Sequence, residues 1–265
     1  MATWEFTATG PIQAELKLPA GSVRVAASKT STITVTLHPA SGSGERLIEE
    51  TEVSFEAGTL AVRVPEKVRV RGNAALDLMI ELPEGSRITA DTASADLVCS
   101  GDLGGLNAKT ASGDIIADRV NGDVNHVTAS GDIRLADTTG DVWAETASGD
   151  VFIERAGGDI IAKTASGDLT VGQAGQSVTA RTASGDVRVN QIATGLADIS
   201  SMSGDVTLAV LPGASVYLDI STLSGHVSSE LESTTGTDED PGLTLSCQTL
   251  TGDVRVIRAA ADPIH

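Results

Sequence analysis

The chain has 265 residues and a formal net charge of −18, from 36 acidic and 18 basic side chains. A negative field of this size repels phosphate backbones and anionic lipid surfaces, so the composition excludes nucleic-acid binding. Aromatic residues make up only 2% of the chain although hydrophobic residues make up 40%, so the interior must be narrow and built from Ala, Val, Ile and Leu.

The cysteines and the start of the chain bear on its location. Cys99 and Cys247 could pair only if the fold brings them together, and two cysteines do not indicate a disulfide framework. The start, Met-Ala-Thr-Trp-Glu-Phe, has no basic region followed by an apolar run, so we expect no signal peptide. No stretch approaches the roughly 18 apolar residues of a membrane span. The default expectation is a cytoplasmic protein.

Residues 1–91 alternate apolar and polar positions, as strands with one buried face do. Because an open end of stacked strands exposes unpaired backbone groups, we expect these residues to form an irregular N-terminal β cap, continuous with the structure that follows. No long helix is expected. The alternating runs are Ile12 to Leu18, Val23 to Ala27, Ile33 to Leu37, Leu60 to Val64 and Leu76 to Leu82.

A repeat dominates residues 92–227. The pentapeptide Thr-Ala-Ser-Gly-Asp recurs every 18 residues, and an imperfect copy begins one period earlier, at Thr92. A unit of this length is too short to bury a core alone, so the units must stack. The five full copies begin at Thr110, Thr128, Thr146, Thr164 and Thr182.

Two short strands are predicted in each unit. Counted from its Thr, positions 6 and 8 are apolar or small, and so are most residues at positions 15 and 17, while Gly recurs at positions 4 and 13, where sharp corners are needed. The predicted fold class is all-β: a parallel β-solenoid, of the β-helix or β-roll type, with 18-residue coils. The general rule for parallel crossovers predicts a right-handed solenoid.

Position 2 of the repeat leaves two interpretations open. Strict alternation from positions 15 and 17 would turn the next Thr inward and the following Ala outward. The later copies, however, place Met202, Leu223 and Leu250 at this position. These large apolar side chains favour burial of position 2, with a break in alternation just before it.

The spacing lengthens after Thr182, where imperfect copies begin at Ser201, Thr222 and Thr249. Residues 236–242 are acidic and contain Pro and Gly, so we expect a loop that leaves the coil and returns to it. Leu243, Leu245 and Cys247 then alternate, which predicts a C-terminal closing strand. Residues 228–265 would thus form an acidic insertion followed by the end of the solenoid.

The Thr-Ala-Ser-Gly-Asp-Val array, the upstream Leu-Pro-x-Gly-Ser turns at Leu18 and Leu82, and the final Leu-Thr-Gly-Asp-Val segment resemble a bacterial family. Its members are described as putative adhesin, or β-strand-repeat, proteins of unknown function. The resemblance covers nearly the whole chain and implies a β-solenoid. It also implies a link to cell-envelope stress, as for some relatives.

Stacked coils would align one corner Asp of each unit in a row. Carboxylates about 5 Å apart repel each other, so hydrogen bonds to corner amides or bound cations must offset the repulsion. Corner capping is the favoured interpretation and a calcium ladder the alternative, although this motif lacks the Gly-Gly-x-Gly-x-Asp of known calcium repeats and offers few oxygens per corner. A second, shorter row would hold Asp123, Asp141 and Asp159. The first row is Asp114, Asp132, Asp150, Asp168 and Asp186.

No catalytic constellation stands out. The four histidines do not recur with the repeat, so a Ser-His-Asp triad is not indicated. Acid–base pairs of carboxylates could lie in the Asp rows, but nothing distinguishes one unit as an active site. His126 falls at an inward position where other units have Ala, and we expect it to be buried and hydrogen-bonded. No cofactor is expected.

Four outward positions carry large apolar residues: Ile116 and Phe152 at position 7, and Trp143 and Ile161 at position 16. Trp143 and Ile161 should be neighbours on one sheet face. They are either isolated surface hydrophobes or a patch for a protein partner or for self-association. We expect a non-enzymatic scaffold or protein-interaction module with an unknown partner. A surface adhesin and a carbohydrate-active enzyme on a β-helix are the alternatives.

Overall fold

The computed structural model describes residues 1–40, 44–64, 75–231 and 242–259. Most of the expected acidic loop, residues 232–241, lies outside these ranges. The chain forms two compact units, Met1–Asp137 and Thr138–His265. This division falls inside the regular repeat, whereas the boundaries expected at residues 91 and 227 follow the repeat pattern and stay predictions.

The first unit contains β-strands and one short helix in its described residues. Each coil has two facing layers of strands. The long strands β2 and β7 bend and run through both layers, whereas each later strand is short and lies in one layer. The elements are β1 (Ala2–Thr7), β2 (Gln13–Ser28), β3 (Thr32–Pro39), α1 (Gly44–Glu50), β4 (Glu52–Glu56), β5 (Thr59–Arg63), β6 (Leu76–Pro83), β7 (Arg87–Leu103), β8 (Gly105–Ser112), β9 (Ile115–Val120), β10 (Val124–Ser130) and β11 (Ile133–Thr138).

β2 and β7 pair in parallel along most of their length. On its other edge, β2 pairs with β5 over its first half and with β6 over its second half. The inward side chains change parity at the bend, since Leu18 is buried before it and Val23 after it. β8 and β9 then pair in parallel with the two halves of β7, and β10 with β8.

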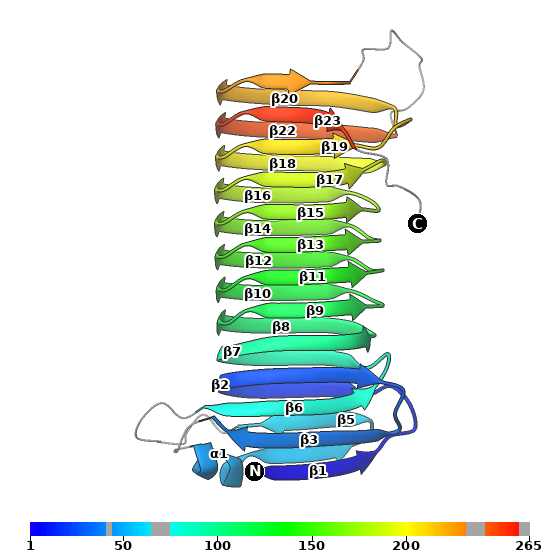
Figure 1. Ribbon diagram of the computed structural model, residues 1–265, viewed down its shortest axis with the longest axis vertical. Helices are drawn as coiled ribbons and strands as arrows, with labels where there is room; N and C mark the ends of the chain where they lie inside the picture. The colour runs from blue at the N-terminus through cyan, green and yellow to red at the C-terminus, as the bar shows by residue number, and fades with distance from the viewer. Residues whose placement is uncertain (41–43, 65–74, 232–241, 260–265) are drawn as a thin grey trace. The chain divides into compact units, whose positions relative to one another are not determined.

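Antiparallel strands cover the N-terminal end of the first unit (Figure 1). β1 pairs with β3, β3 with β6, and β4 with β5, all antiparallel. The rings of Phe6 and Phe55, from β1 and β4, lie 5.8 Å apart. The helix α1, which buries Leu47, was not expected, because seven residues are too few to show a helical period.

Among the described residues of the second unit, all the regular elements are strands. It consists of short strands that alternate between two facing layers. They are β12 (Val142–Ser148), β13 (Val151–Ala156), β14 (Ile160–Ser166), β15 (Leu169–Ala174), β16 (Val178–Ser184), β17 (Val187–Ile192), β18 (Gly195–Ser203), β19 (Val206–Val210), β20 (Val216–Ser224), β21 (Val227–Ser229), β22 (Leu243–Thr251) and β23 (Val254–Arg258).

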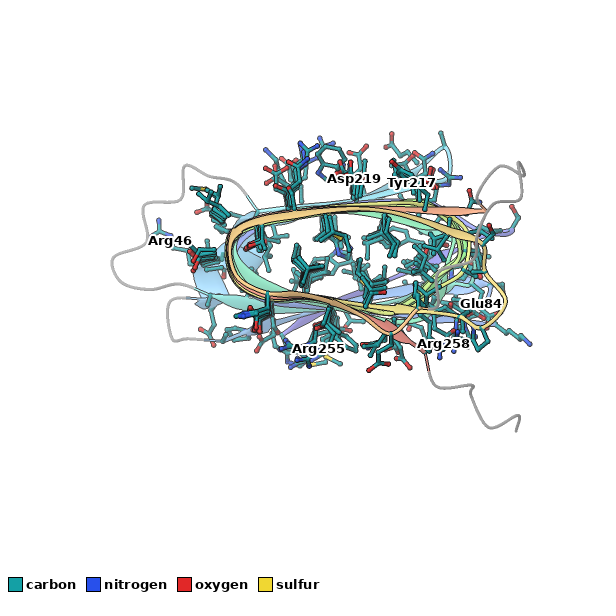
Figure 2. All side chains as sticks on the ribbon, turned by 90° about the horizontal axis from the view of Figure 1, so that it is seen from above. Arg46, Glu84, Tyr217, Asp219, Arg255 and Arg258 are labelled. Atoms are coloured by element: carbon teal, nitrogen blue, oxygen red, sulfur yellow. The ribbon has the colours of Figure 1, made fainter. Side chains whose placement is uncertain are left out.

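Equivalent residues of successive coils in the second unit are paired in register. Val142 pairs with Ile160, and Ile160 with Val178, all three buried. The facing layer repeats the pattern, with Val151 paired with Leu169. In Figure 2 the inward side chains fill the space between the two layers. The predicted all-β parallel solenoid is therefore confirmed, and its right-handed sense stays a prediction.

The order of the last coils differs from the order expected. β22 pairs with β18 on one edge and with β20 on the other, and β23 likewise lies between β19 and β21 (Figure 1). The final strands are thus inserted, and the coil of β20 and β21 is outermost. The inserted coil buries Leu243, Leu245 and Cys247 completely. These residues do form the expected strand, but it does not close the solenoid, because β20 lies beyond it.

Position 2 of the repeat is exposed, so the expectation of burial was also wrong. In β12, Thr146 is buried and Ala147 is exposed, and the same holds for Thr164 and Ala165 in β14. Alternation continues through Thr, and parity breaks afterwards, at the corner. In some coils the Thr hydroxyl at this position reaches a corner carbonyl, as Thr164 Oγ1 reaches Gly149 O at 3.3 Å, whereas Thr128 Oγ1 has no hydrogen-bond partner.

Candidate functional site

A ladder of hydrogen bonds joins the corner aspartates of the second unit. The backbone N–H of each corner Asp donates to Oδ1 of the corner Asp in the preceding coil. The distance is 2.9 Å from Asp168 to Asp150, 2.8 Å from Asp186 to Asp168, and 2.9 Å from Asp205 to Asp186. Each carboxylate therefore caps the next coil, as one of the two interpretations of the sequence proposed.

The ladder ends at a residue that is not aspartate. Asp253, in the inserted coil, donates its N–H to Asp205 Oδ1 at 2.8 Å, and His226 in the outermost coil donates to Asp253 Oδ1, also at 2.8 Å. The outermost coil has no coil beyond it among the described residues, so no acceptor is required at its corner. The histidine in place of aspartate marks the last coil.

The first unit has the same ladder. Asp114 N donates to Asp96 Oδ1 at 3.0 Å, and Asp132 N to Asp114 Oδ1 at 2.9 Å. The second carboxylate oxygen is also used at some corners, because Arg134 Nη2 lies 2.8 Å from Asp132 Oδ2. These charge-assisted contacts offset the repulsion between stacked carboxylates.

The second acidic row follows the same principle. Asp159 N donates to Asp141 Oδ1 at 2.9 Å, and Ser177 N to Asp159 Oδ1 at 3.1 Å. Ser177 then replaces the carboxylate, and its Oγ lies 3.3 Å from Leu196 N. A neutral acceptor can therefore do what the carboxylate does, which indicates that the position requires an oxygen and no charge.

The ladder gives the corner carboxylates a structural role. In the part of the chain that the structure describes, no group of three or more His, Cys, Asp or Glu side chains is placed to hold a metal ion. Calcium binding by Asp114, Asp132, Asp150, Asp168 and Asp186 stays the untested alternative to corner capping, and a calorimetric titration with calcium tests it.

Trp143 and Ile161 lie together on the outer face of one layer of the second unit. They are register partners on β12 and β14, and Trp143 is 37% exposed. The Nζ of Lys163, also on β14, lies 4.4 Å from the centroid of the Trp143 ring, a cation–π contact. We call Trp143, Ile161 and Lys163 the Trp143 patch.

The other two apolar residues expected in an interaction patch lie elsewhere. Phe152 is exposed on β13, which belongs to the facing layer, and its register partner is Thr170. Ile116 is on β9 in the first unit, beside Val98. Only Trp143 and Ile161 are thus brought together by the fold of the second unit.

Two overlapping segments, residues 13–175 and 136–263, match the family described as Toastrack DUF4097. Together they span nearly the whole chain. The chain belongs to the Toastrack family. No curated protein matches it.

Two solved structures share the Toastrack chain's fold over nearly its full length. A putative adhesin from Bacteroides fragilis is 12% identical, with a TM-score of 0.54, over 97% of this chain and 96% of that one. A putative lipid binding protein from Parabacteroides distasonis is 15% identical, with the same TM-score and the same coverage. At these identities the similarity shows the fold alone.

His126 is fully buried in the first unit of the Toastrack chain, as expected, but it is not hydrogen-bonded. Neither ring nitrogen has a hydrogen-bond partner. Its register partner on β8 is Ala108, so the neighbouring coil offers no acceptor at this position. Burial lowers the pKa of the imidazole from 6.5 to about 3. The ring is therefore neutral at neutral pH, and the expected hydrogen bond was wrong.

The two cysteines are free and buried, one in each unit. Burial raises the pKa of each thiol to about 12, with a smaller contribution from a nearby aspartate. They are therefore core residues of low reactivity. No helix within the described ranges of this Toastrack chain is long and apolar enough to cross a membrane.

One candidate surface was missed in the sequence. Met202, Leu250 and Leu223 are exposed, and they follow one another across β18, β22 and β20, because their flanking residues are register partners. We call these three residues the apolar ridge. Burial of position 2 was predicted from these same side chains, so their alignment as an outward row was overlooked. Strict alternation through Thr would have found it.

Proposed function

We propose that this Toastrack chain is a non-enzymatic scaffold whose Trp143 patch binds a protein partner. The observation that supports the proposal is the exposed Trp143 beside the half-buried Ile161 on one sheet face, with Lys163 over the indole. Trp is enriched at the centres of protein interfaces, where a rigid ring buries a large area at low entropy cost.

The solenoid would act by holding this patch rigid. Trp143 and Ile161 are outward residues of strands whose inward neighbours, Val142, Ala144, Ile160 and Ala162, are buried in the core. Beside Trp143 and Ile161 runs a file of outward residues, meaning residues at the same position in successive coils. This file contains Glu145, Lys163 and Arg181. A partner that places apolar side chains on Trp143 and a carboxylate near Lys163 would match this face.

A carbohydrate-active enzyme is the less favoured alternative. A groove of about 400 Å³ in the first unit is lined by the carboxylates of Glu15 and Asp91. Each faces a cation, since Arg63 Nη2 lies 2.7 Å from Glu15 Oε2 and Lys17 Nζ lies 4.0 Å from Asp91 Oδ2. Both carboxylates are thus engaged by basic side chains of the groove, which makes it weak support for glycoside cleavage, a reaction that uses two carboxylates placed on the sugar.

A surface adhesin is the second alternative, and the name of the Bacteroides fragilis protein supports it. An adhesin and an internal scaffold would use the same sheet faces and differ in location and partner. A cytoplasmic location and a link to cell-envelope stress stay predictions. Cell fractionation with an antibody against the chain distinguishes the two, because an adhesin is found at the cell surface.

Affinity capture with cross-linking tests the proposed scaffold function. We expect the wild-type chain to retain a protein partner that the double variant Trp143→Ser, Ile161→Thr loses. Phe152→Thr is the matched control, because it removes an equally exposed aromatic side chain from the facing layer. Identical capture by all three chains would contradict the proposal. Release of reducing sugar from polysaccharide by the wild-type chain would support the enzyme instead.

A further inference from the structure

The outermost coil of the second unit has one edge without a strand partner. β20 pairs with β22 and β21 with β23, and neither has a second partner among the described residues. The inward side chains are correspondingly exposed. Val227 is 49% exposed. Val254, its register partner, and Val206, the register partner of Val254, are fully buried. Val216, Leu218 and Ile220 are only half-buried.

The apolar ridge runs up to this edge. Leu223, its last residue, is 82% exposed on β20. At the other end of the same strand, Tyr217 is also exposed, and its file continues through Thr244 to Leu196, another exposed apolar residue. Figure 2 shows Tyr217 and Asp219 on the outer face of one layer, with Arg255 on the outer face of the other.

β20 lacks the features that protect natural strand edges from pairing. Charged side chains, especially Lys, proline and bulges normally protect such edges. The sequence of β20, Val-Tyr-Leu-Asp-Ile-Ser-Thr-Leu-Ser, has one charge, at Asp219, and no proline or lysine. In a chain of net charge −18, an unpaired edge strand of nine residues with a single charged side chain lets two copies approach with little local repulsion.

We propose that this edge joins two copies of the chain, with β20 of each pairing antiparallel about Ile220. This register sets Leu223 opposite Tyr217 of the second copy and extends the apolar ridge across the interface. It also sets Asp219 opposite Ser221, so no like charges face each other. A register centred on Asp219 would place two carboxylates in direct opposition, which is unfavourable. The proposal does not depend on the Trp143 patch.

Charge substitutions at Ser221 test the proposal in both directions. Ser221 is exposed and points outward beside Gln248 of β22, so neither variant should disturb folding. Ser221→Lys places an ammonium opposite Asp219 of the second copy and should tighten the dimer by about three- to tenfold in Kd. Ser221→Asp places a carboxylate there and should weaken it by a similar factor.

Sedimentation equilibrium over a range of protein concentrations gives the Kd of each chain. Ser200→Lys and Ser200→Asp are the matched controls, because Ser200 lies in the same file but two coils from the edge. They should shift the Kd much less. The wild-type dimer should tighten between about 0.05 M and about 0.5 M salt, because screening reduces the repulsion between two acidic chains.

A chain that stays monomeric under all these conditions, Ser221→Lys included, overturns the proposal, even if a different protein binds the β20 edge. A dimer with the same Kd for Ser221→Lys and Ser221→Asp also overturns it, because the interface then lies elsewhere. The double variant Trp143→Ser, Ile161→Thr should leave the Kd unchanged, which separates this result from that of the scaffold test.

Discussion

At the residue scale, one oxygen per corner satisfies the backbone of the next coil. Asp168 both donates its N–H to Asp150 Oδ1 and accepts the N–H of Asp186. The row of carboxylates is thus explained by hydrogen bonding rather than by charge. Ser177 at the other corner, which accepts with a neutral hydroxyl, supports the same conclusion.

Two substitutions at Asp168 separate the oxygen from the charge. Asp168→Asn keeps Oδ1 and removes one like charge from the row, so the free energy of unfolding should stay within about 0.5 kcal/mol of wild type or rise. Asp168→Ala removes the acceptor as well and should be about 1 kcal/mol less stable than Asp168→Asn. Urea denaturation measures the difference, and equal stability of the two variants would exclude a role for Oδ1.

Buried His126 makes stability depend on pH. Its pKa is 6.5 in the unfolded chain and about 3 in the folded chain, so below pH 6.5 the unfolded chain binds a proton that the folded chain does not. The folded state should therefore lose stability as pH falls from 6.5 towards 3. Between pH 7 and pH 4.5 we expect a loss of about 2 to 3 kcal/mol from this residue.

The variant His126→Leu isolates this contribution. Leu has a similar volume and carries no unpaired ring nitrogens, so the variant should be more stable than wild type at pH 7 by about 1 kcal/mol, and the gap should widen at pH 4.5. Other titrating groups cancel in the comparison of the two chains. A constant gap across this pH range would contradict the burial of a neutral imidazole.

At the scale of elements, local pattern predicted most of the strands. Alternation located β2, β3, β5 and β6, and the spacing of Gly-Asp located the regular coils. Ala147 was expected to face inward but faces outward. The error arose because a sequence shows only to within one or two residues where the alternation of inward and outward positions breaks. The Trp143–Ile161 contact could be predicted, since register follows from the period.

Some features depend on contacts between segments distant in sequence. The insertion of β22 between β18 and β20 is one of them, because its strands read alone would stack equally well in chain order. The sequence does hold one sign of the outermost coil, which is His226 at the corner where other coils have aspartate. The missing hydrogen bond of His126 could not be predicted, since it depends on what surrounds the ring.

The corner glycine of each coil allows the backbones to approach closely. Gly167 has a φ of +150°, and a Cβ at this position would lie 2.0 Å from the carbonyl oxygen of Gly149. Gly167→Ala should therefore destabilise the chain by more than about 2 kcal/mol. Gly10→Ala is the control, because a Cβ there meets no atom within 4 Å, and it should change stability by less than about 1 kcal/mol. Similar thermal unfolding midpoints for the two variants would contradict this packing.

At the scale of the whole chain, each unit gains stability coil by coil, because a coil contacts mainly its neighbours. The two units differ in how their outermost strands are covered. The first unit covers its N-terminal end with antiparallel strands, whereas the second unit ends in β20 and β21 with no second strand partner among the described residues. The first unit thus protects its N-terminal edge, and the second unit leaves the edge of β20 and β21 available, which is the basis of the proposed dimer.

The central claim is that equivalent residues stack in register, with the final coil inserted before the outermost one. In the facing layer of the second unit, Phe152, Thr170, Arg188, Thr207, Arg255 and Ser228 form one file in this spatial order. Arg255 is therefore four coil spacings from Phe152, about 19 Å, and Ser228 is five, about 24 Å.

Pulsed electron paramagnetic resonance on two doubly spin-labelled chains measures these separations. One chain carries labels at residues 152 and 255 and the other at residues 152 and 228, with Cys99 and Cys247 replaced by Ala. We predict that the 152–228 distance is the longer by about one coil spacing, although residue 228 is nearer to 152 in sequence. A longer 152–255 distance, or two distances that fit no multiple of one strand spacing, would contradict the account.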